Sequence, residues 1–211
     1  RACALRFAKL GFGGVVNYSR SEAEAIETAA EVEHLGGKAL VHQCDVSDDQ
    51  AVTEMVGVIQ RTFWRLDILI NNAATTNFIS HEKLADLTES MWDRMWAVNV
   101  KGAFFTTRAA SELLQQSDQG AVVNIASVAG ITGSGSSIAY CATKGALITM
   151  TKSMARVLAP KVTVNAVCPG PIDSRWIREG NPDWDLNEMV ADYPIPKASS
   201  PDEIADAVVY F

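Results

Sequence analysis

The chain has little that would mark a nucleic-acid-binding or disulfide-bonded protein. Its 18 Lys and Arg residues are outnumbered by 25 Asp and Glu residues, and they form no basic run. The resulting net charge of −7 does not suit the phosphate backbone of a nucleic acid, so we expect no nucleic-acid partner. The four cysteines are scattered without C-x-x-C spacing, at Cys3, Cys44, Cys141 and Cys168. This pattern is typical of reduced thiols and favours neither a disulfide framework nor a zinc site.

Long apolar runs and metal-ligand patterns are also lacking. No stretch approaches the roughly 20 apolar residues of a membrane-spanning helix, and the first residues do not have the form of a signal peptide. His34, His42 and His81 show no metal-ligand spacing. We therefore expect a soluble, cytoplasmic protein with no membrane partner and no metal. With 211 residues, 48% of them hydrophobic, the chain can bury a core, and residues 1–211 are expected to form one domain.

What the sequence does contain is an alternation of apolar runs and helical stretches. Five short, β-branched runs are predicted to be buried strands: 14–18, 38–46, 66–73, 121–127 and 162–170. Two of the intervening stretches begin with capping-box patterns, Ser21 with Glu24 and Ser47 with Gln50. Strict alternation implies right-handed crossovers. The expected fold is therefore α/β, a doubly wound and mainly parallel sheet with helices on both faces, of the Rossmann-like kind.

In such a sheet, ligands bind at the carboxyl ends of the strands, where this chain has small and polar residues. They are Ser19, Arg20, Asp45, Val46, Asn72, Ala73, Ser127, Pro169, Gly170, Ile172 and Ser174. After Ser127, a loop rich in glycine and serine leads to Tyr140 and Lys144, which are spaced to share one face of a helix. Because the loop can bring Ser127 back to that face, we expect these three side chains to converge.

Several spaced motifs make the chain similar to the short-chain dehydrogenase/reductase family of the ordinary type. They are "CDVSD" (44–48), "NNAA" (71–74), "NVKG" (99–102), Ser127 with "YCATK" (140–144), and "PGPIDS" (169–174). The resemblance covers essentially the whole chain and includes 3-oxoacyl-acyl-carrier-protein reductases and glucose dehydrogenases. Two positions depart from the family pattern: Ala74, where glycine is more frequent, and Ser174, where threonine is more frequent.

The resemblance implies an NAD(P)(H)-dependent oxidoreductase that interconverts a carbonyl and a secondary alcohol by hydride transfer. It makes Tyr140 the general acid/base and Ser127 a hydrogen-bond partner of the substrate oxygen. Lys144 would also hold the nicotinamide ribose, and Asn99 would complete the catalytic group through a bound water. Reduction of a carbonyl leaves an alkoxide that needs a proton, which a tyrosine donates best when its pKa is close to neutral. We therefore expect the ammonium of Lys144 to lower the pKa of Tyr140.

The strand-end residues, with Tyr140 and Lys144, are the cofactor-binding residues that the resemblance implies. An NAD enzyme usually has an acidic residue at the end of the second strand of the fold, whereas Ser19 and Arg20 stand there in this chain. NADP(H) is therefore expected, with NAD(H) as the alternative. The resemblance gives Asp45 a contact with the adenine.

The strand and glycine-rich turn with which a dinucleotide site of this kind normally begins are not found. The early cluster "GFGG" (11–14) follows a helical stretch and precedes a strand, so we interpret it as a helix end and turn. The resemblance places the glycine turn before Arg1 and a last strand beyond Phe211. We therefore expect the given residues to lack both strands and to be part of a longer enzyme.

The sequence says less about the substrate and the oligomeric state. The segment 171–200 corresponds to the variable substrate loop of the family, and its Trp176, Trp184 and Tyr193 favour an apolar or ring-bearing small molecule. Apolar residues on more than one face of 88–115 and 138–158 indicate a homo-oligomer, a tetramer or dimer by resemblance. Two other functions stay open: a non-catalytic cofactor-binding or structural relative, and a dehydratase or epimerase on a related fold.

Overall fold

The computed structural model describes residues 1–180 and 184–211. Five strands form in the predicted places: β1 (Gly14–Tyr18), β2 (Ala39–Gln43), β3 (Ile68–Asn71), β4 (Gly120–Ile125) and β5 (Val162–Val167). All pairings between them are parallel. Four of the strands end before the predicted runs do, because the last residues of those runs leave the sheet and form the loops of the site.

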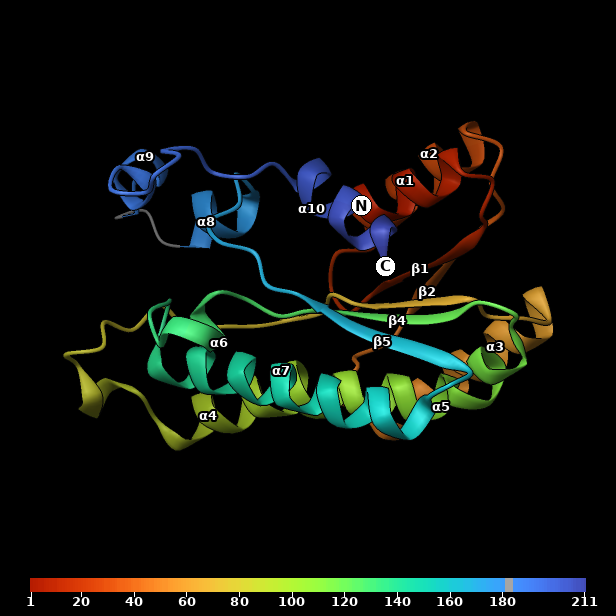
Figure 1. The fold of residues 1–211 in the computed structure, drawn as a ribbon, viewed down its shortest axis with the longest axis horizontal. Coiled ribbons are helices and arrows are strands. Elements are labelled where there is room, and N and C mark those ends of the chain that lie inside the picture. Colours follow the sequence, from red (N-terminus) through yellow and green to blue (C-terminus); the bar gives the residue numbers. More distant parts are fainter. Residues whose placement is uncertain (181–183) are drawn as a thin grey trace.

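Helices cover both faces of these strands. They are α1 (Ala2–Lys9), α2 (Glu22–His34), α3 (Asp49–Phe63), α4 (Glu89–Trp96), α5 (Ala103–Gln116), α6 (Ala129–Thr132), α7 (Ile138–Leu158), α8 (Arg175–Gly180), α9 (Leu186–Val190) and α10 (Pro201–Tyr210). A 3₁₀ turn, η1 (Leu84–Asp86), precedes α4, and a π-helical segment, η2 (Ala97–Gly102), joins α4 to α5. Figure 1 shows α1, α2 and α10 on one side of the strands and α3, α5 and α7 on the other. The predicted α/β arrangement is confirmed.

The strands form two separate sheets. β1 pairs with β2, and β4 lies between β3 and β5. Among residues 1–180 and 184–211, no strand lies between β1 and β3 and hydrogen-bonds to both. The prediction that these residues lack a central strand is thus confirmed. The facing edges of β1 and β3 instead line a cavity, to which Val15 and Val16 contribute from one side and Leu69 and Ile70 from the other.

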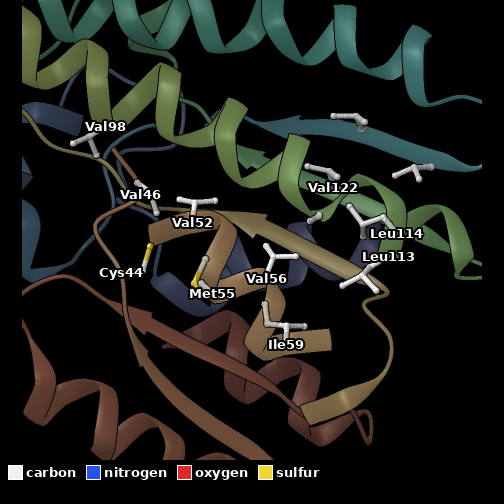
Figure 2. Close-up of a cluster of buried hydrophobic side chains, with 13 residues drawn as sticks. Cys44, Val46, Val52, Met55, Val56, Ile59, Val98, Leu113, Leu114 and Val122 are labelled. Carbon is white, nitrogen blue, oxygen red and sulfur yellow. The ribbon is translucent and has the colours of Figure 1, made fainter. Parts of the chain in front are cut away.

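The main hydrophobic core packs α3 and α5 against the strands. On α3, Val52, Met55, Val56 and Ile59 recur at helical spacing, so one stripe of the helix is buried. Figure 2 shows this stripe facing side chains of α5 and β4, in a cluster that includes Cys44, Val46, Val98, Leu113, Leu114 and Val122. Burying such side chains contributes about 1.5–3 kcal/mol each to folding, so this cluster fixes α3 and α5 on the sheet.

The two capping patterns mark helix starts correctly, but the predicted caps do not form. α2 begins after Ser21, whose side chain makes no capping hydrogen bond, and Glu24 pairs with an arginine elsewhere. α3 is capped by Asp48, which accepts two backbone N–H groups of the first turn. Ser47 donates its hydroxyl to Asp45 instead. The carboxylate of Asp48 is a stronger acceptor for backbone N–H groups than a serine hydroxyl, so the helix begins one residue later than predicted.

The early glycine cluster ends a helix, as predicted. Gly11 has φ of +88° and donates its N–H to the carbonyl of Ala8 in the last turn of α1. Glycine adopts this left-handed conformation without steric cost, which makes it the usual residue after a helix. Two residues on, a Cβ at Gly13 would come within 2.6 Å of the carbonyl oxygen of Lys38, so the chain enters β1 through a close backbone contact.

Candidate active site

The carboxyl ends of the strands open into one cavity of about 2280 Å³. Its wall contains every residue predicted for the site except Asn99: Ser19, Arg20, Asp45, Val46, Asn72, Ala73, Ser127, Tyr140, Lys144, Pro169, Gly170, Ile172 and Ser174. The residues come from five strand ends and one helix. Parallel strands place their carboxyl ends at the same edge, which is why residues far apart in sequence meet here.

The chain after β4 returns to the cavity through the short helix α6 and then forms α7. Ser137 caps α7 by accepting the N–H of Tyr140, so the tyrosine lies in the first turn. Lys144 follows one turn later on the same face. α6 lies directly on α7, because a Cβ at Gly130 would come within 2.5 Å of the backbone carbon of Lys144. This close contact holds the loop that carries Ser127 beside the tyrosine.

The Lys144 side chain is buried at the floor of the site. The residue is only 2% exposed, and its Nζ donates a hydrogen bond of 2.6 Å to the carbonyl oxygen of Ile125 at the end of β4. The same Nζ lies 5.6 Å from the centre of the Tyr140 ring. Because burial disfavours the charged form, it lowers the pKa of Lys144 to about 8.

The pKa of Tyr140 does not follow the prediction. Burial raises it above the ordinary value, and a hydrogen bond with Ser127 opposes that rise only in part. The predicted net lowering of the Tyr140 pKa is therefore wrong for this structure, because desolvation of the phenolate is the largest effect on it. The physical consequence is that Tyr140 keeps its proton at neutral pH. It can donate that proton to an oxygen that gains charge.

Asn99 lies behind the cavity wall. It is 1% exposed in the π-helical segment η2, and its amide is fully partnered. Its Oδ1 accepts the N–H of Thr75 at 2.8 Å, and its Nδ2 donates to the Thr75 carbonyl at 2.9 Å and to the Thr143 hydroxyl at 3.0 Å. The amide thus joins the segment after β3 to α7. The π-helical turn is a common feature of functional sites and turns Asn99 inward here.

Asp45 has a partner that the sequence did not suggest. Its carboxylate accepts two hydrogen bonds from Ser47, and a third, of 2.9 Å, from Nη2 of Arg94 on α4. Burial acts to raise the pKa of Asp45, but these hydrogen bonds hold it below the usual value. Arg94 and Asp45 are 49 residues apart, and no local pattern relates them. The ion pair fixes the carboxylate at the end of β2.

A buried amide network beneath the site was also not predicted. Nδ2 of Asn71 on β3 donates to Oδ1 of Asn124 on β4 at 2.8 Å, and Asn124 donates to Thr151 on α7 at 2.9 Å. Thr106 on α5 completes the network by donating to Oδ1 of Asn71 at 2.6 Å. A lone asparagine inside each apolar run was the available signal, since a buried amide needs partners. The satisfied network ties the two strands to the two helices.

The structure adds little that would suggest metal or membrane binding. In residues 1–180 and 184–211, no group of three or more His, Cys, Asp and Glu side chains is arranged to hold a metal ion. Within the same ranges, none of the helices has both the length and the apolar character needed to cross a bilayer.

Comparisons with known proteins agree with this geometry. Residues 1–184 match the family model described as short chain dehydrogenase. The 3-oxoacyl-[acyl-carrier-protein] reductase of Synechocystis sp. is 33% identical over 211 residues, which is 99% of this chain and 82% of that protein. A crystal structure described as a short-chain dehydrogenase/reductase from Burkholderia xenovorans has a TM-score of 0.91 at 35% identity, covering 99% of this chain and 84% of that one. NAD⁺-bound xylitol dehydrogenase has a TM-score of 0.87 at 30% identity, covering 99% and 85%. The chain therefore belongs to the short-chain dehydrogenase family, whose members are oxidoreductases.

Proposed function

We propose that this protein uses NADP(H) to interconvert a carbonyl and a secondary alcohol, with Tyr140 as the general acid/base. The observation that carries the proposal is the convergence of Ser127, Tyr140 and Lys144 on one cavity. Ser127 and Tyr140 both line the cavity, and Nζ of Lys144, one helical turn along α7, lies 5.6 Å from the centre of the Tyr140 ring. These groups can hold a substrate oxygen and move a proton to or from it.

Each side chain has a distinct task in the proposed reaction. A bound nicotinamide cofactor supplies or accepts the hydride. Tyr140 gives its proton to the carbonyl oxygen during reduction and takes it back during oxidation. Ser127 donates a hydrogen bond to the same oxygen and stabilises its developing charge. The Lys144 ammonium, oriented by the Ile125 carbonyl, stabilises the phenolate that Tyr140 becomes after proton donation.

The charged residues around the cavity fit a dinucleotide phosphate. Arg20 lies at the end of β1, and within the part of the chain that the structure describes it forms no ion pair, so its guanidinium is available to a ribose phosphate. Asp45 is held as a carboxylate beside it and can accept from an adenine amine. Lys144 can donate to the nicotinamide ribose. NAD(H) is the alternative, because the xylitol dehydrogenase neighbour holds NAD⁺.

Other features complete the proposal. Residues 1–211 act as one dehydrogenase domain. Asn99 holds α7 and the segment that follows β3 in position, and a water is bound near Lys144. A second copy of the chain covers the apolar side chains that α4 and α5 leave on the surface, since Trp96 is 40% and Phe104 is 41% exposed. This face suits a homo-oligomer.

Replacing Tyr140 by phenylalanine tests the catalytic assignment. Tyr140→Phe removes one hydroxyl from the cavity, so turnover should fall by about 10²–10⁴-fold, the usual contribution of a general acid, while the fold and cofactor affinity stay nearly unchanged. The measurement is the rate at which the protein oxidises reduced nicotinamide in the presence of a panel of ketones, monitored by the absorbance of the reduced nicotinamide. Tyr210→Phe is the matched control, because Tyr210 is 85% exposed and lies outside the cavity.

The same experiment separates the other functions. A non-catalytic relative would bind the reduced cofactor but would not oxidise it with any ketone. A dehydratase or epimerase would change the substrate without net nicotinamide turnover. Retention of more than about a tenth of the rate in Tyr140→Phe would contradict the acid/base role.

A further inference from the structure

Two aromatic rings, Trp176 and Trp184, lie in the wall of the cavity that contains Tyr140, and Phe78 packs against Trp184 from the wall of a smaller neighbouring cavity. Trp176 on α8 has its ring centre 6.5 Å from that of Tyr140, and the ring planes are tilted by 44°. Phe78 and Trp184 meet edge to face, with centres 5.0 Å apart. Trp176 is 42% exposed although it lies in the cavity wall, so much of its surface has no protein partner. A ligand bound at Tyr140 would contact this surface.

The wall opposite Trp176 is fixed by contacts between two loops. The N–H of Ile79 donates to the carbonyl of Ser136 at 2.9 Å, and the hydroxyls of Thr76 and Ser136 share a hydrogen bond of 2.6 Å. His81 bonds to the carbonyl of Gly135 at 3.2 Å. These contacts join the loop after β3 to the loop after β4. The polar groups of Thr76, Ser136 and His81 are therefore already paired with the protein, and the rings beside them are left to contact a ligand.

A smaller cavity of about 280 Å³ continues beyond these rings, and its wall includes Phe78, His81, Ser136 and Trp184. Gly180, at the end of α8, packs on Phe78, because a Cβ at Gly180 would come within 2.6 Å of the ring. The volume lies just below the usual range of whole ligand sites of about 300–1,000 Å³, which suits one ring of a larger ligand.

The charged side chains nearby are paired with each other. Arg175 contacts Glu24 and lies 3.7 Å from Glu179, and Arg178 lies 2.6 Å from Asp173. Both arginines of α8 thus have carboxylate partners. A substrate on a phosphate-bearing carrier needs cations that are not already neutralised, and α8 offers none within the described residues.

From this arrangement we propose that the substrate is an uncharged ketone or secondary alcohol with an aromatic or alicyclic ring, selected by Trp176, Phe78 and Trp184. The proposal rests on the proposed function of the site and names its substrate class. A ring held between Trp176 and the pair of Phe78 and Trp184 gains stacking and edge contacts that a flexible chain makes poorly. The carbonyl next to the ring then reaches Tyr140 and Ser127.

Two ketones with the same number of carbons test this selection. Acetophenone and 2-octanone are compared with the acetoacetyl thioester of N-acetylcysteamine, using the protein with NADPH. We expect kcat/KM for acetophenone to exceed that for each of the other two by roughly five- to tenfold, the factor that one aromatic contact provides. Equal or better use of 2-octanone or the thioester would overturn the proposal.

The Trp176→Leu variant shows whether this tryptophan makes the difference. It should remove most of the preference for acetophenone over 2-octanone, because kcat/KM for acetophenone falls more than kcat/KM for 2-octanone. The control is Trp64→Leu, because Trp64 is 80% exposed and lies outside both cavities. An unchanged preference in Trp176→Leu would contradict the role of Trp176.

A binding measurement separates this proposal from the proposed function. Saturation-transfer NMR with 1-phenylethanol should show transfer to the ring protons in the parent protein and in Trp64→Leu, and much less in Trp176→Leu. If no ketone is reduced but this binding pattern is found, the oxidoreductase assignment fails and the ring site stands. If ketones are reduced but the binding pattern is not found, the ring site fails and the oxidoreductase assignment stands.

Discussion

At the scale of single residues, the site combines two desolvated groups whose pKa values shift in opposite directions. Burial lowers the pKa of Lys144 to about 8 and raises that of Tyr140, so at neutral pH Tyr140 keeps its proton and Lys144 is still mainly an ammonium. Proton transfer from Tyr140 to a substrate oxygen creates a phenolate next to the Lys144 ammonium. The two charges then stabilise each other, and the arrangement favours the state after proton donation over either isolated charge. Tyr140 therefore gives up its proton only when a substrate oxygen that gains negative charge is bound next to it.

The buried ammonium predicts a dependence of stability on pH. Its folded-state pKa of about 8 lies below the unfolded value, so the unfolded chain binds more protons between the two values and stability rises with pH there. Between about pH 7.5 and pH 9.5, the free energy of unfolding of the parent should rise by about 2 kcal/mol relative to Lys144→Met. Urea unfolding of both proteins measures this difference, in which other titrating groups cancel. A constant difference over this range would mean that Lys144 is not held in a desolvated site.

A second prediction at this scale concerns Arg20. Arg20→Asp replaces a phosphate partner by a hydroxyl acceptor, so the ratio of kcat/KM for NADPH to that for NADH should fall by at least about tenfold. Arg61→Asp on α3, which changes the charge by the same amount, is the control. Steady-state kinetics with both cofactors gives the ratio. Equal use of the two cofactors by the parent protein would remove the basis for this prediction.

At the scale of elements, the sequence predicted which segments form strands better than how the helices begin. The five strands were predictable because each is a short apolar, β-branched run, and the run 14–18 matches β1 residue for residue. The cap of α3 was not, since Asp48 and Ser47 are both good caps, and the Ser47 hydroxyl bonds to Asp45 two residues away instead of capping the helix. The inward direction of Asn99 depends on a π-helical turn, which no local pattern indicated.

A substitution at Gly130 tests the close contact between α6 and α7. Gly130→Ala places a methyl group against the backbone of α7, which cannot move aside as a side chain would. We expect a loss of about 1–3 kcal/mol in stability, as for other overpacked sites, and a larger relative loss of activity because the loop with Ser127 shifts from Tyr140. Thermal unfolding and ketone reduction measure the two effects. Gly14→Ala is the control, since a Cβ there would meet nothing within 4 Å, and an equal response of both variants would contradict the close contact.

At the scale of the whole molecule, the two sheets lie between the same two layers of helices. The helix α3, which follows β2, packs on α5 through the main core, and the Arg6–Asp206 ion pair joins α1 to α10. These contacts hold the β1–β2 sheet beside the β3–β4–β5 sheet without strand pairing. The alternation of strands and helices along the chain was predicted from the sequence, and so was a role for Trp176 and Trp184 in substrate binding. The Arg94–Asp45 pair and the contact of Trp184 with Phe78 were not, because both depend on which segments the folded chain brings together.

Hydrogen exchange should show the two sheets as regions of unequal protection. In β1, Gly14 donates its N–H to Lys38 beside β2, so by the alternation of a strand Val16 also points to β2 and Val15 points to the cavity. In a protein made of residues 1–211, we expect the Val15 amide to exchange at least about 100-fold faster than that of Val123, which lies in β4 between two paired strands. Val16 is the control within the same strand and should exchange more slowly than Val15. Protection of Val15 equal to that of Val123 would show that another segment pairs with the open edge of β1, and the separation of the two sheets would then be wrong.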